Sequence, residues 1–208
     1  MKVTPIIAAI LLVISTQTSA NLITNGDFQT CDFSHWGLDT DGTGEPADTN
    51  AFTIINDAGQ CSAQIATDGL FPEGFANTLF TDLDLSSVSL GTILDLQFDW
   101  AFSGFDIQTD NFSDYFTVGL NTGMDFETLL FVDENGSGTF STQLDTRYNG
   151  ASLDFALLPG FNPQSFSSTF TIDNVSLTER VEVSAPHTSL LLAFGMCAIA
   201  LRRKFHQQ

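Results

Sequence analysis

A strict alternation of apolar and polar residues is the feature that most constrains the fold. Between residues 94 and 102, apolar Leu94, Leu96, Phe98, Trp100 and Phe102 are separated by Asp95, Gln97, Asp99 and Ala101. This period of two is typical of a β-strand with one buried face, because successive side chains point to opposite sides of a sheet. The period recurs at 116–120, 140–144 and 153–157, and shorter apolar runs lie at 52–55, 83–85, 88–90 and 129–132.

Turn residues separate these runs, and no helix pattern interrupts them. The dipeptides Asn25-Gly26, Asn135-Gly136 and Asn149-Gly150 are turn formers. No window of helical length before residue 183 shows a convincing 3.6-residue period. Many short strands without helices predict an antiparallel sandwich or barrel.

The final strand changes phase partway along. Phe170 and Ile172 share one phase, whereas Val175 and Leu177 share the other. The change falls at Asp173-Asn174 and predicts a β-bulge, in which an extra residue re-aims side chains. The Asp173 carboxylate then either points at a neighbouring loop or stays in water at a twisted edge.

The N-terminus has the three parts of a secretory signal peptide. Lys2 is the only charge in the first twenty residues, residues 6–14 are apolar, and small residues precede a cleavage site after Ala20. The apolar run is shorter than the roughly 20 residues of a membrane span. We therefore expect residues 1–20 to be removed on export and residues 21–182 to form one domain.

This domain is strongly acidic. It holds all 25 acidic residues, and only Arg147 and Arg180 oppose them, for a formal charge of −23. Such a field makes nucleic acid and anionic lipid poor partners. The carboxylates either form a solvated surface or share bound Ca²⁺, a cation that prefers oxygen ligands.

The number and positions of the cysteines are consistent with an exported protein. Cys197 lies in the apolar C-terminal run, which leaves Cys31 and Cys61 as a pair in the domain. In an oxidising compartment we expect them to form a disulfide.

Two motifs at the ends of the domain resemble those of galactose-binding-like jelly rolls, which include several families of carbohydrate-binding module. The first is Asn-Leu-Ile-Thr-Asn-Gly-Asp-Phe-Gln at 21–29 with Phe-Ser-His-Trp at 33–36; the second is Phe-Thr-Ile-Asp-Asn-Val-Ser-Leu at 170–177. The resemblance implies an all-β fold, an antiparallel jelly-roll β-sandwich. It also implies a structural Ca²⁺ between the first and last strands, with Asp173 and oxygens around Asp27 and Gln29 as ligands. Gln29 stands where these families usually have Glu, so one negative ligand is missing.

The C-terminal segment 183–208 resembles the PEP-CTERM sorting signals of exported proteins in Gram-negative bacteria. A short motif, Val183-Ser184-Ala185-Pro186, precedes an apolar run to Leu201 and the basic cluster Arg202-Arg203-Lys204. The resemblance implies insertion in the inner membrane, cleavage by an exosortase-type enzyme, and delivery to the cell surface or an exopolysaccharide matrix. Residues 185–201 are at the lower limit of a transmembrane helix, and the basic cluster would stay in the cytoplasm. A permanent single-span anchor and a docked hydrophobic helix are the alternatives.

For function, the sequence favours a non-catalytic module that binds a polysaccharide or another partner. Jelly-roll modules stack aromatic rings on sugars, and the candidate platforms are Trp36, Tyr115 and Tyr148. A glycan-cleaving enzyme with two carboxylates is one alternative, although 25 acids make a suitably spaced pair almost unavoidable by chance, so the acids are weak evidence for it. A structural or adhesive matrix protein without a discrete ligand is the other. We do not expect an enzyme.

Overall fold

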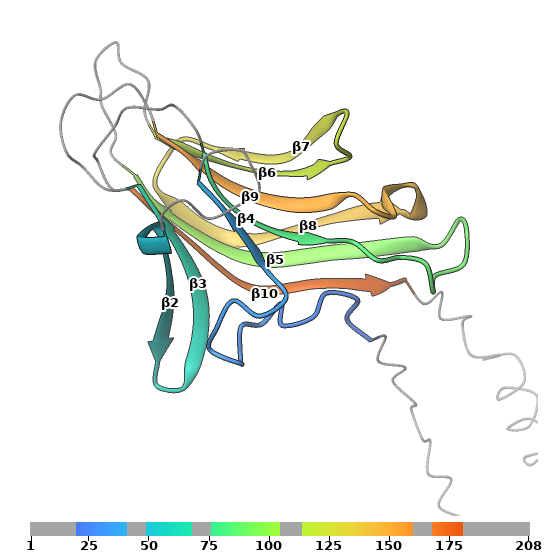
Figure 1. Cartoon of the computed structure of the whole chain (residues 1–208), viewed down its shortest axis with the longest axis horizontal. Coiled ribbons are helices and arrows are strands. Elements are labelled where there is room, and N and C mark those ends of the chain that lie inside the picture. Colours follow the sequence, from blue (N-terminus) through green and yellow to red (C-terminus); the bar gives the residue numbers. More distant parts are fainter. Residues whose placement is uncertain (1–19, 41–48, 68–75, 105–113, 160–167, 181–208) are drawn as a thin grey trace, which may run out of the picture.

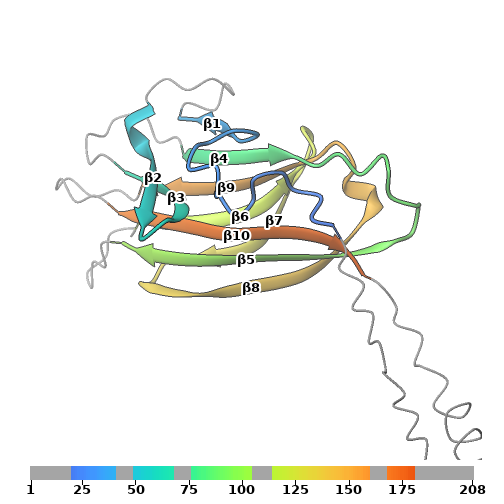
Figure 2. The ribbon, with the colours of Figure 1, turned by 90° about the horizontal axis from the view of Figure 1, so that it is seen from below.

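The protein is a β-sandwich of two five-stranded antiparallel sheets (Figures 1 and 2). The computed structural model describes residues 20–40, 49–67, 76–104, 114–159 and 168–180. Within these residues, sheet A has the order β2-β3-β10-β5-β8 and sheet B the order β1-β4-β9-β6-β7. The strands are β1 (Gly37–Asp39), β2 (Phe52–Asp57), β3 (Gln60–Ala66), β4 (Asn77–Asp82), β5 (Ile93–Ser103), β6 (Tyr115–Asn121), β7 (Phe126–Val132), β8 (Gly136–Asp145), β9 (Ser152–Leu158) and β10 (Thr169–Glu179), with short 3₁₀ helices η1 (Thr49–Ala51) and η2 (Thr146–Tyr148).

Phenylalanine rings fill the space between the sheets. Phe116 of β6 stacks on Phe170 of β10 with 3.9 Å between ring centroids, which joins the middles of the two sheets. Phe155 of β9 meets Phe98 of β5 edge-on at 5.1 Å. All four side chains are fully buried. Each contributes about 1.5–3 kcal/mol by leaving water, so these rings help to hold the two sheets together.

The predicted alternation is confirmed in most of the strands. The runs at 94–102, 116–120, 140–144 and 153–157 are β5, β6, β8 and β9, and their apolar side chains face the other sheet. The runs at 83–85 and 88–90 are not strands. Leu83, Leu85 and Val88 are nevertheless buried, because this loop packs its apolar side chains into the core. The loop forms backbone hydrogen bonds with the turn after η2: Leu83 N–H donates to Ala151 O (2.9 Å), and Gly150 N–H donates to Leu83 O (2.9 Å).

The predicted bulge in β10 is also confirmed. The β10–β5 register shifts between Asp173 and Ser176, and Asn174 adopts a positive φ of 53°. The N-terminal loop occupies the space opened by the bulge, and Val175 N–H donates to Gly26 O (2.8 Å). A Cβ at Gly26 would collide with the Val175 carbonyl, so only glycine allows this approach.

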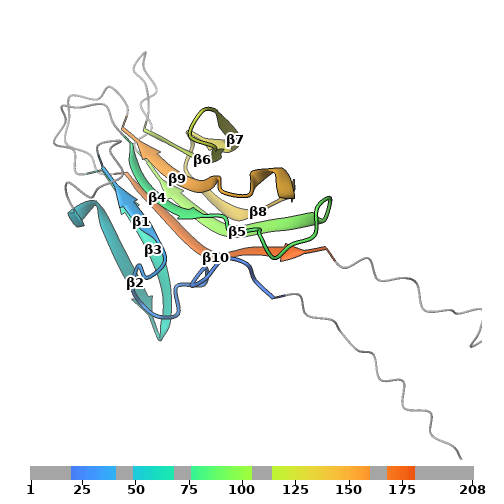
Figure 3. The ribbon, with the colours of Figure 1, turned by 45° about the vertical axis from the view of Figure 1, so that its right-hand side comes forward.

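The chain is anchored to β10 from the first residue after the predicted cleavage site. The Asn21 side chain donates to Val175 O (3.0 Å) and accepts from Leu177 N–H (2.8 Å). Leu22 N–H donates to Leu177 O (2.8 Å). The N-terminal arm and the end of β10 therefore lie side by side, as Figure 3 shows.

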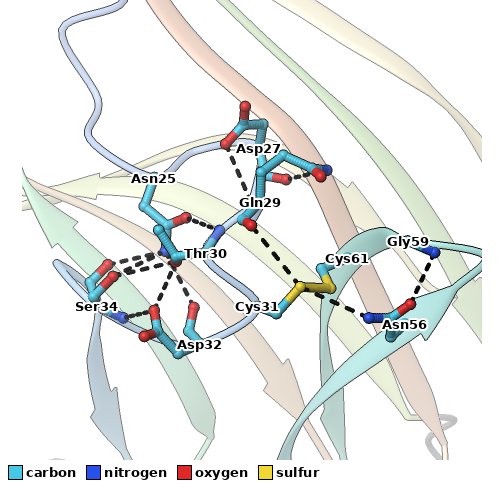
Figure 4. The surroundings of a disulfide bond; sticks show 10 residues. All are labelled: Asn25, Asp27, Gln29, Thr30, Cys31, Asp32, Ser34, Asn56, Gly59 and Cys61. Carbon is cyan, nitrogen blue, oxygen red and sulfur yellow. Dashed lines mark hydrogen bonds between the residues drawn. A yellow bond between two sulfur atoms is a disulfide. The ribbon is translucent and has the colours of Figure 1, made fainter.

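The expected disulfide is present. Cys31 and Cys61 are bonded with a Cα–Cα distance of 5.4 Å, which ties the N-terminal loop to β3 (Figure 4). Next to it, the exposed carboxylate of Asp32 accepts from Ser34 N–H (3.0 Å) and Thr30 Oγ1 (2.7 Å). Hydrogen bonds to this carboxylate, of which the one from the Ser34 side chain has the largest effect, lower the pKa of Asp32 to about 2.

The two predicted membrane-related segments lie outside the described residues. These are the signal peptide, of which only Ala20 is described, and the sorting tail 183–208. Among the described residues, no helix is long and apolar enough to span a bilayer.

Removing the disulfide should destabilise the domain. We expect Cys31→Ser with Cys61→Ala to lower the free energy of unfolding by about 3–4 kcal/mol, because a closed loop of 30 residues restricts the unfolded chain. Urea unfolding followed by tryptophan fluorescence measures this change. Free thiols at both positions in the non-reduced wild-type protein would contradict the pairing.

Candidate functional site

Aromatic side chains on the outside of the sandwich belong to sheet B. Its outward-facing rings are Phe80 of β4, Tyr115 of β6, and Phe126 and Phe131 of β7, and all four are exposed or half-buried. We call this set, together with the polar residues Asn121 and Asp154 between them, the aromatic face. The pairing registers place all six residues on one side of sheet B, because each is opposite another outward residue or glycine.

The outer face of sheet A has a different character. Its described outward residues on β3, β5, β8 and β10 include no aromatic residue, and apart from Ile93 at the start of β5 they are small or polar: Ser62, Gln64, Ala66, Asp95, Gln97, Asp99, Ala101, Ser137, Thr139, Ser141, Gln143, Thr169, Thr171, Asp173, Ser176 and Thr178. The two faces of the described sandwich therefore offer different chemistry. Only sheet B presents flat apolar rings to solvent.

Tyr115 and Phe131 form an exposed ring pair. Their centroids are 5.1 Å apart and their planes are inclined by 36°. Phe131 is 53% exposed although it lies on a strand, so its ring is not part of the core. The half-buried ring of Tyr115 and the exposed ring of Phe131 thus contact each other on the outer face of sheet B.

Phe80 and Phe126 lie flat on the sheet because glycines make room for them. A Cβ at Gly37 would collide with the ring of Phe80, and a Cβ at Gly119 would collide with the ring of Phe126. Gly37 is opposite Phe80 in the register of β1 and β4. Both rings are thus held against the backbone of a neighbouring strand, on either side of β9.

Asp154 is the polar centre of the aromatic face. It is opposite Phe80 on one side and Gly119 on the other. It accepts from Asn121 Nδ2 (3.2 Å) and from Ser152 Oγ (2.5 Å). Burial raises the pKa of the Asp154 carboxyl, an effect that these two donors oppose and that repulsion from Asp82 and Asp39 increases. The carboxylate is therefore fixed in orientation and is a poorly solvated acceptor.

Of the three aromatic platforms predicted from the sequence, only Tyr115 is on this face. Trp36 is buried, stacked on Phe28 at 5.1 Å, and its Nε1–H donates to Asn25 O (3.1 Å). Tyr148 is also buried, and its hydroxyl donates to Glu127 (2.5 Å). The prediction of Trp36 and Tyr148 as platforms is corrected, because both rings have core partners and no free face.

The predicted calcium residues lie beside the β10 bulge. An open hollow of about 560 Å³ is lined by Asn21, Ile23, Asn25, Gly26, Asp27, Gln97, Asp99, Asn174, Val175 and Ser176. Burial raises the pKa of Asp173, and repulsion from Asp99 and Asp27 adds to this effect. Gln29 Nε2 donates to Asp27 O (3.1 Å), within its own loop. The hollow is lined by carboxylate and amide side chains, and Ca²⁺ prefers oxygen ligands such as theirs. Among the described residues, however, no group of three Asp, Glu, His or Cys side chains is arranged to hold a metal ion.

Sequence reasoning missed most of the aromatic face. Phe80 lies on β4, which no clear alternation indicated, and Phe126 and Phe131 lie on an edge strand of mixed pattern. Two of these rings lie over a glycine of a neighbouring strand, Phe80 over Gly37 and Phe126 over Gly119. This pairing could have indicated the face, but it can be recognised only when the strand register is known.

Comparisons with known proteins agree on the fold. No family model matches the chain, and no curated protein matches it. Among solved structures, it is similar to TmCBM61 in complex with β-1,4-galactotriose, with a TM-score of 0.51, 14% identity, and coverage of 78% of this chain and 100% of that one. The CBM22-1 xylan-binding domain of Paenibacillus barcinonensis Xyn10C gives a TM-score of 0.44, 13% identity, and coverage of 78% and 96%. The chain has the jelly-roll fold of carbohydrate-binding modules.

The Asp154 carboxyl should make stability depend on pH. Its pKa is raised in the folded state, so the stability that it contributes is present at low pH and is lost as pH rises through that pKa. We expect Asp154→Asn to raise the melting temperature at pH 7 and to have little effect at pH 3.

Asp84 is the matched control for this experiment. Hydrogen bonds from Ser86 lower its pKa, so Asp84→Asn should lower the melting temperature at pH 7, the opposite sign. Thermal unfolding at both pH values measures the two effects. An Asp154→Asn protein that melts below wild type at pH 7 would contradict the assignment.

Proposed function

We propose that this protein is an exported, non-catalytic module that binds a polysaccharide through the aromatic face. The observation that supports this most directly is the segregation of exposed rings to one sheet. A folded protein keeps four aromatic side chains on a solvent face at a cost in solubility, so their grouping indicates a ligand.

The arrangement suits a pyranose ring. The C–H groups of a sugar pack on an aromatic ring, and sugar hydroxyls donate to fixed carboxylate and amide oxygens. The Tyr115–Phe131 pair supplies the ring surface. Asp154 lies about 7 Å along the strands from the Thr117–Phe131 row, and β6 lies between Asp154 on β9 and Phe131 on β7, which adds about 10 Å across the sheet. The carboxylate supplies the acceptor, and a linked oligosaccharide rather than a single sugar is needed to reach both.

The fold adds support at a general level. The jelly roll found here is shared with a module whose structure contains a galactotriose. At 14% identity the likeness concerns the backbone, so the ligand of that module is not carried over. The proposal for this chain depends on its own rings and its own carboxylate.

Delivery to the outside completes the proposal. The signal peptide exports the chain, the tail 183–208 holds it in the inner membrane, and an exosortase-type enzyme cleaves near Pro186 to release it to the cell surface or an exopolysaccharide matrix. A matrix polysaccharide is the ligand class that such a route would bring to the module. The disulfide agrees with this route, since it needs an oxidising compartment.

The glycan proposal can be tested on an array. We expect the wild-type exported chain to bind at least one polysaccharide, and Tyr115→Ala with Phe131→Ala to weaken that binding roughly tenfold, because two ring contacts are lost. Tyr115→Phe should keep most of the affinity. The paired control is Thr139→Ala with Ser141→Ala on the outer face of sheet A, which should bind as wild type does.

Absence of binding to any glycan on the array would favour the structural or adhesive alternative. Equal loss in the sheet A control would place the ligand elsewhere on the sandwich.

Calcium is a second, separate proposal. We expect millimolar calcium to raise the melting temperature relative to a chelator, because a cation would offset the repulsion that Asp99 and Asp27 exert on the Asp173 carboxylate beside the β10 bulge. Asp173→Asn should melt higher than wild type in chelator and should lose the response to calcium. A melting temperature that is the same with calcium and with chelator would exclude the site.

A further inference from the structure

One end of the sandwich combines features that the glycan proposal does not use. We call it the tail-proximal end: the loop 83–92, the turn 122–125, η2 and the last residues of β10. Figure 1 shows these segments together at its right-hand side. Both ends of the described domain are also here, because Asn21 bridges to Thr178 and the chain leaves β10 at Arg180.

The tail-proximal end carries exposed apolar side chains at its tips. Leu90 in the loop before β5 and Met124 in the β6–β7 turn are each 94% exposed, more than any other large apolar residue described. Ile93 is 40% exposed beside them. Leu90 and Met124 lie on different loops at the same end of the sandwich, and exposed apolar side chains gain free energy when they leave water.

Hydrogen bonds within the tail-proximal end hold the loops that carry Leu90 and Met124 in place. Gly91 N–H donates to Thr146 Oγ1 of η2 (3.2 Å), which fixes the loop that carries Leu90. The hydroxyl of Tyr148, also in η2, bonds to Glu127, two residues from the turn that carries Met124. Arg180 N–H donates to Ile93 O (2.9 Å), which joins the loop to the point where the tail begins.

The charges at this end differ from those of the domain as a whole. The exported segment has 25 acidic residues and two basic ones, and both basic residues, Arg147 and Arg180, are in the tail-proximal end. Arg147 lies 3.8 Å from Glu127 and 3.6 Å from Asp145, so it offsets local acids. Arg147 and Arg180 therefore offset only part of the acidic charge of this end, where Asp84, Asp125 and Glu179 also lie.

The length of chain beyond Arg180 decides what can cover these tips. Only residues 181–184 separate Arg180 from the predicted membrane helix at 185–201. Four residues span at most about 14 Å when fully extended. If the tail crosses a bilayer, the tail-proximal end must lie within this distance of the lipid surface.

We propose that the tail-proximal end is a membrane-docking surface, on which Leu90 and Met124 enter the interface of the bilayer that the protein's own tail crosses. The domain then stands on the membrane while the tail is intact. The strands of sheet B run away from this end, so the aromatic face extends outward and stays open to a polysaccharide. Cleavage of the tail removes the tether and leaves only the weak affinity of two apolar side chains.

Depth-dependent quenching tests this proposal on the complete chain. Leu90→Trp and Met124→Trp place a fluorophore at each tip, and the chain is reconstituted in phosphatidylcholine vesicles with lipids brominated near the headgroup. The signal of Trp36 and Trp100, measured on the parent protein, is subtracted. We expect emission from positions 90 and 124 to fall at least twofold relative to vesicles without bromine.

Ser137→Trp is the matched control. Ser137 is an exposed residue on β8 at the opposite end of the sandwich, opposite Ala101, and emission from it should not change. Quenching at position 137 equal to that at 124, or no quenching at 90 and 124 in a chain that floats with the vesicles, would overturn the proposal. A chain that does not float would overturn it together with the predicted membrane span.

A charge variant provides a second measurement. Leu90→Asp with Met124→Asp should increase hydrogen exchange at 86–93 and 122–126 in vesicles, but not in the same chain with its tail cleaved. Ser103→Asp with Ser137→Asp adds the same charge at the far end and should leave both segments unchanged. Faster exchange in both variants would show a general loss of stability and count against docking.

Discussion

The packing of β10 is the interaction on which the rest of the structure depends. This strand lies between β3 and β5 in the middle of sheet A, and its Phe170 stacks on Phe116 of the other sheet. Its bulge at Asp173–Ser176 opens the space into which Gly26 brings the N-terminal loop, and its final residues pair with Asn21. One strand thus joins the two sheets, seats the N-terminus and determines where the C-terminal tail leaves.

The outer faces of the two sheets differ in their side chains because of this arrangement. Because the core uses the inner side of both sheets, each outer face is free to differ, and aromatic rings gather only on that of sheet B within the described residues. Glycines at 37 and 119 let two of those rings lie flat on the sheet. Both ends of the described domain lie at one end of the strands, whereas the aromatic face lies on the outer side of sheet B.

Much of the fold could be predicted from the sequence, since a period of two has few interpretations. The pattern at 94–102 predicted β5, and the phase change at Asp173-Asn174 predicted the bulge. The runs at 83–85 and 88–90 were misread as strands, because a buried loop needs apolar residues as much as a strand does. The candidate site was harder: Trp36 and Tyr148 were reasonable platforms by type, but burial is decided by neighbours distant in sequence, such as Phe155 for Trp36 and Glu127 for Tyr148.

The sequence by itself determined the class of structure. Alternation specified an antiparallel sandwich, cysteine number specified the disulfide, and the two end segments predicted export and membrane tethering. Tertiary structure alone decided which rings face water and which residues gather at the tail-proximal end. The reason is physical: alternation states that one side of each strand is buried, but the surface chemistry depends on strand order and register. These bring Phe80, Phe131 and Asp154, which are spread over 74 residues of sequence, onto one face.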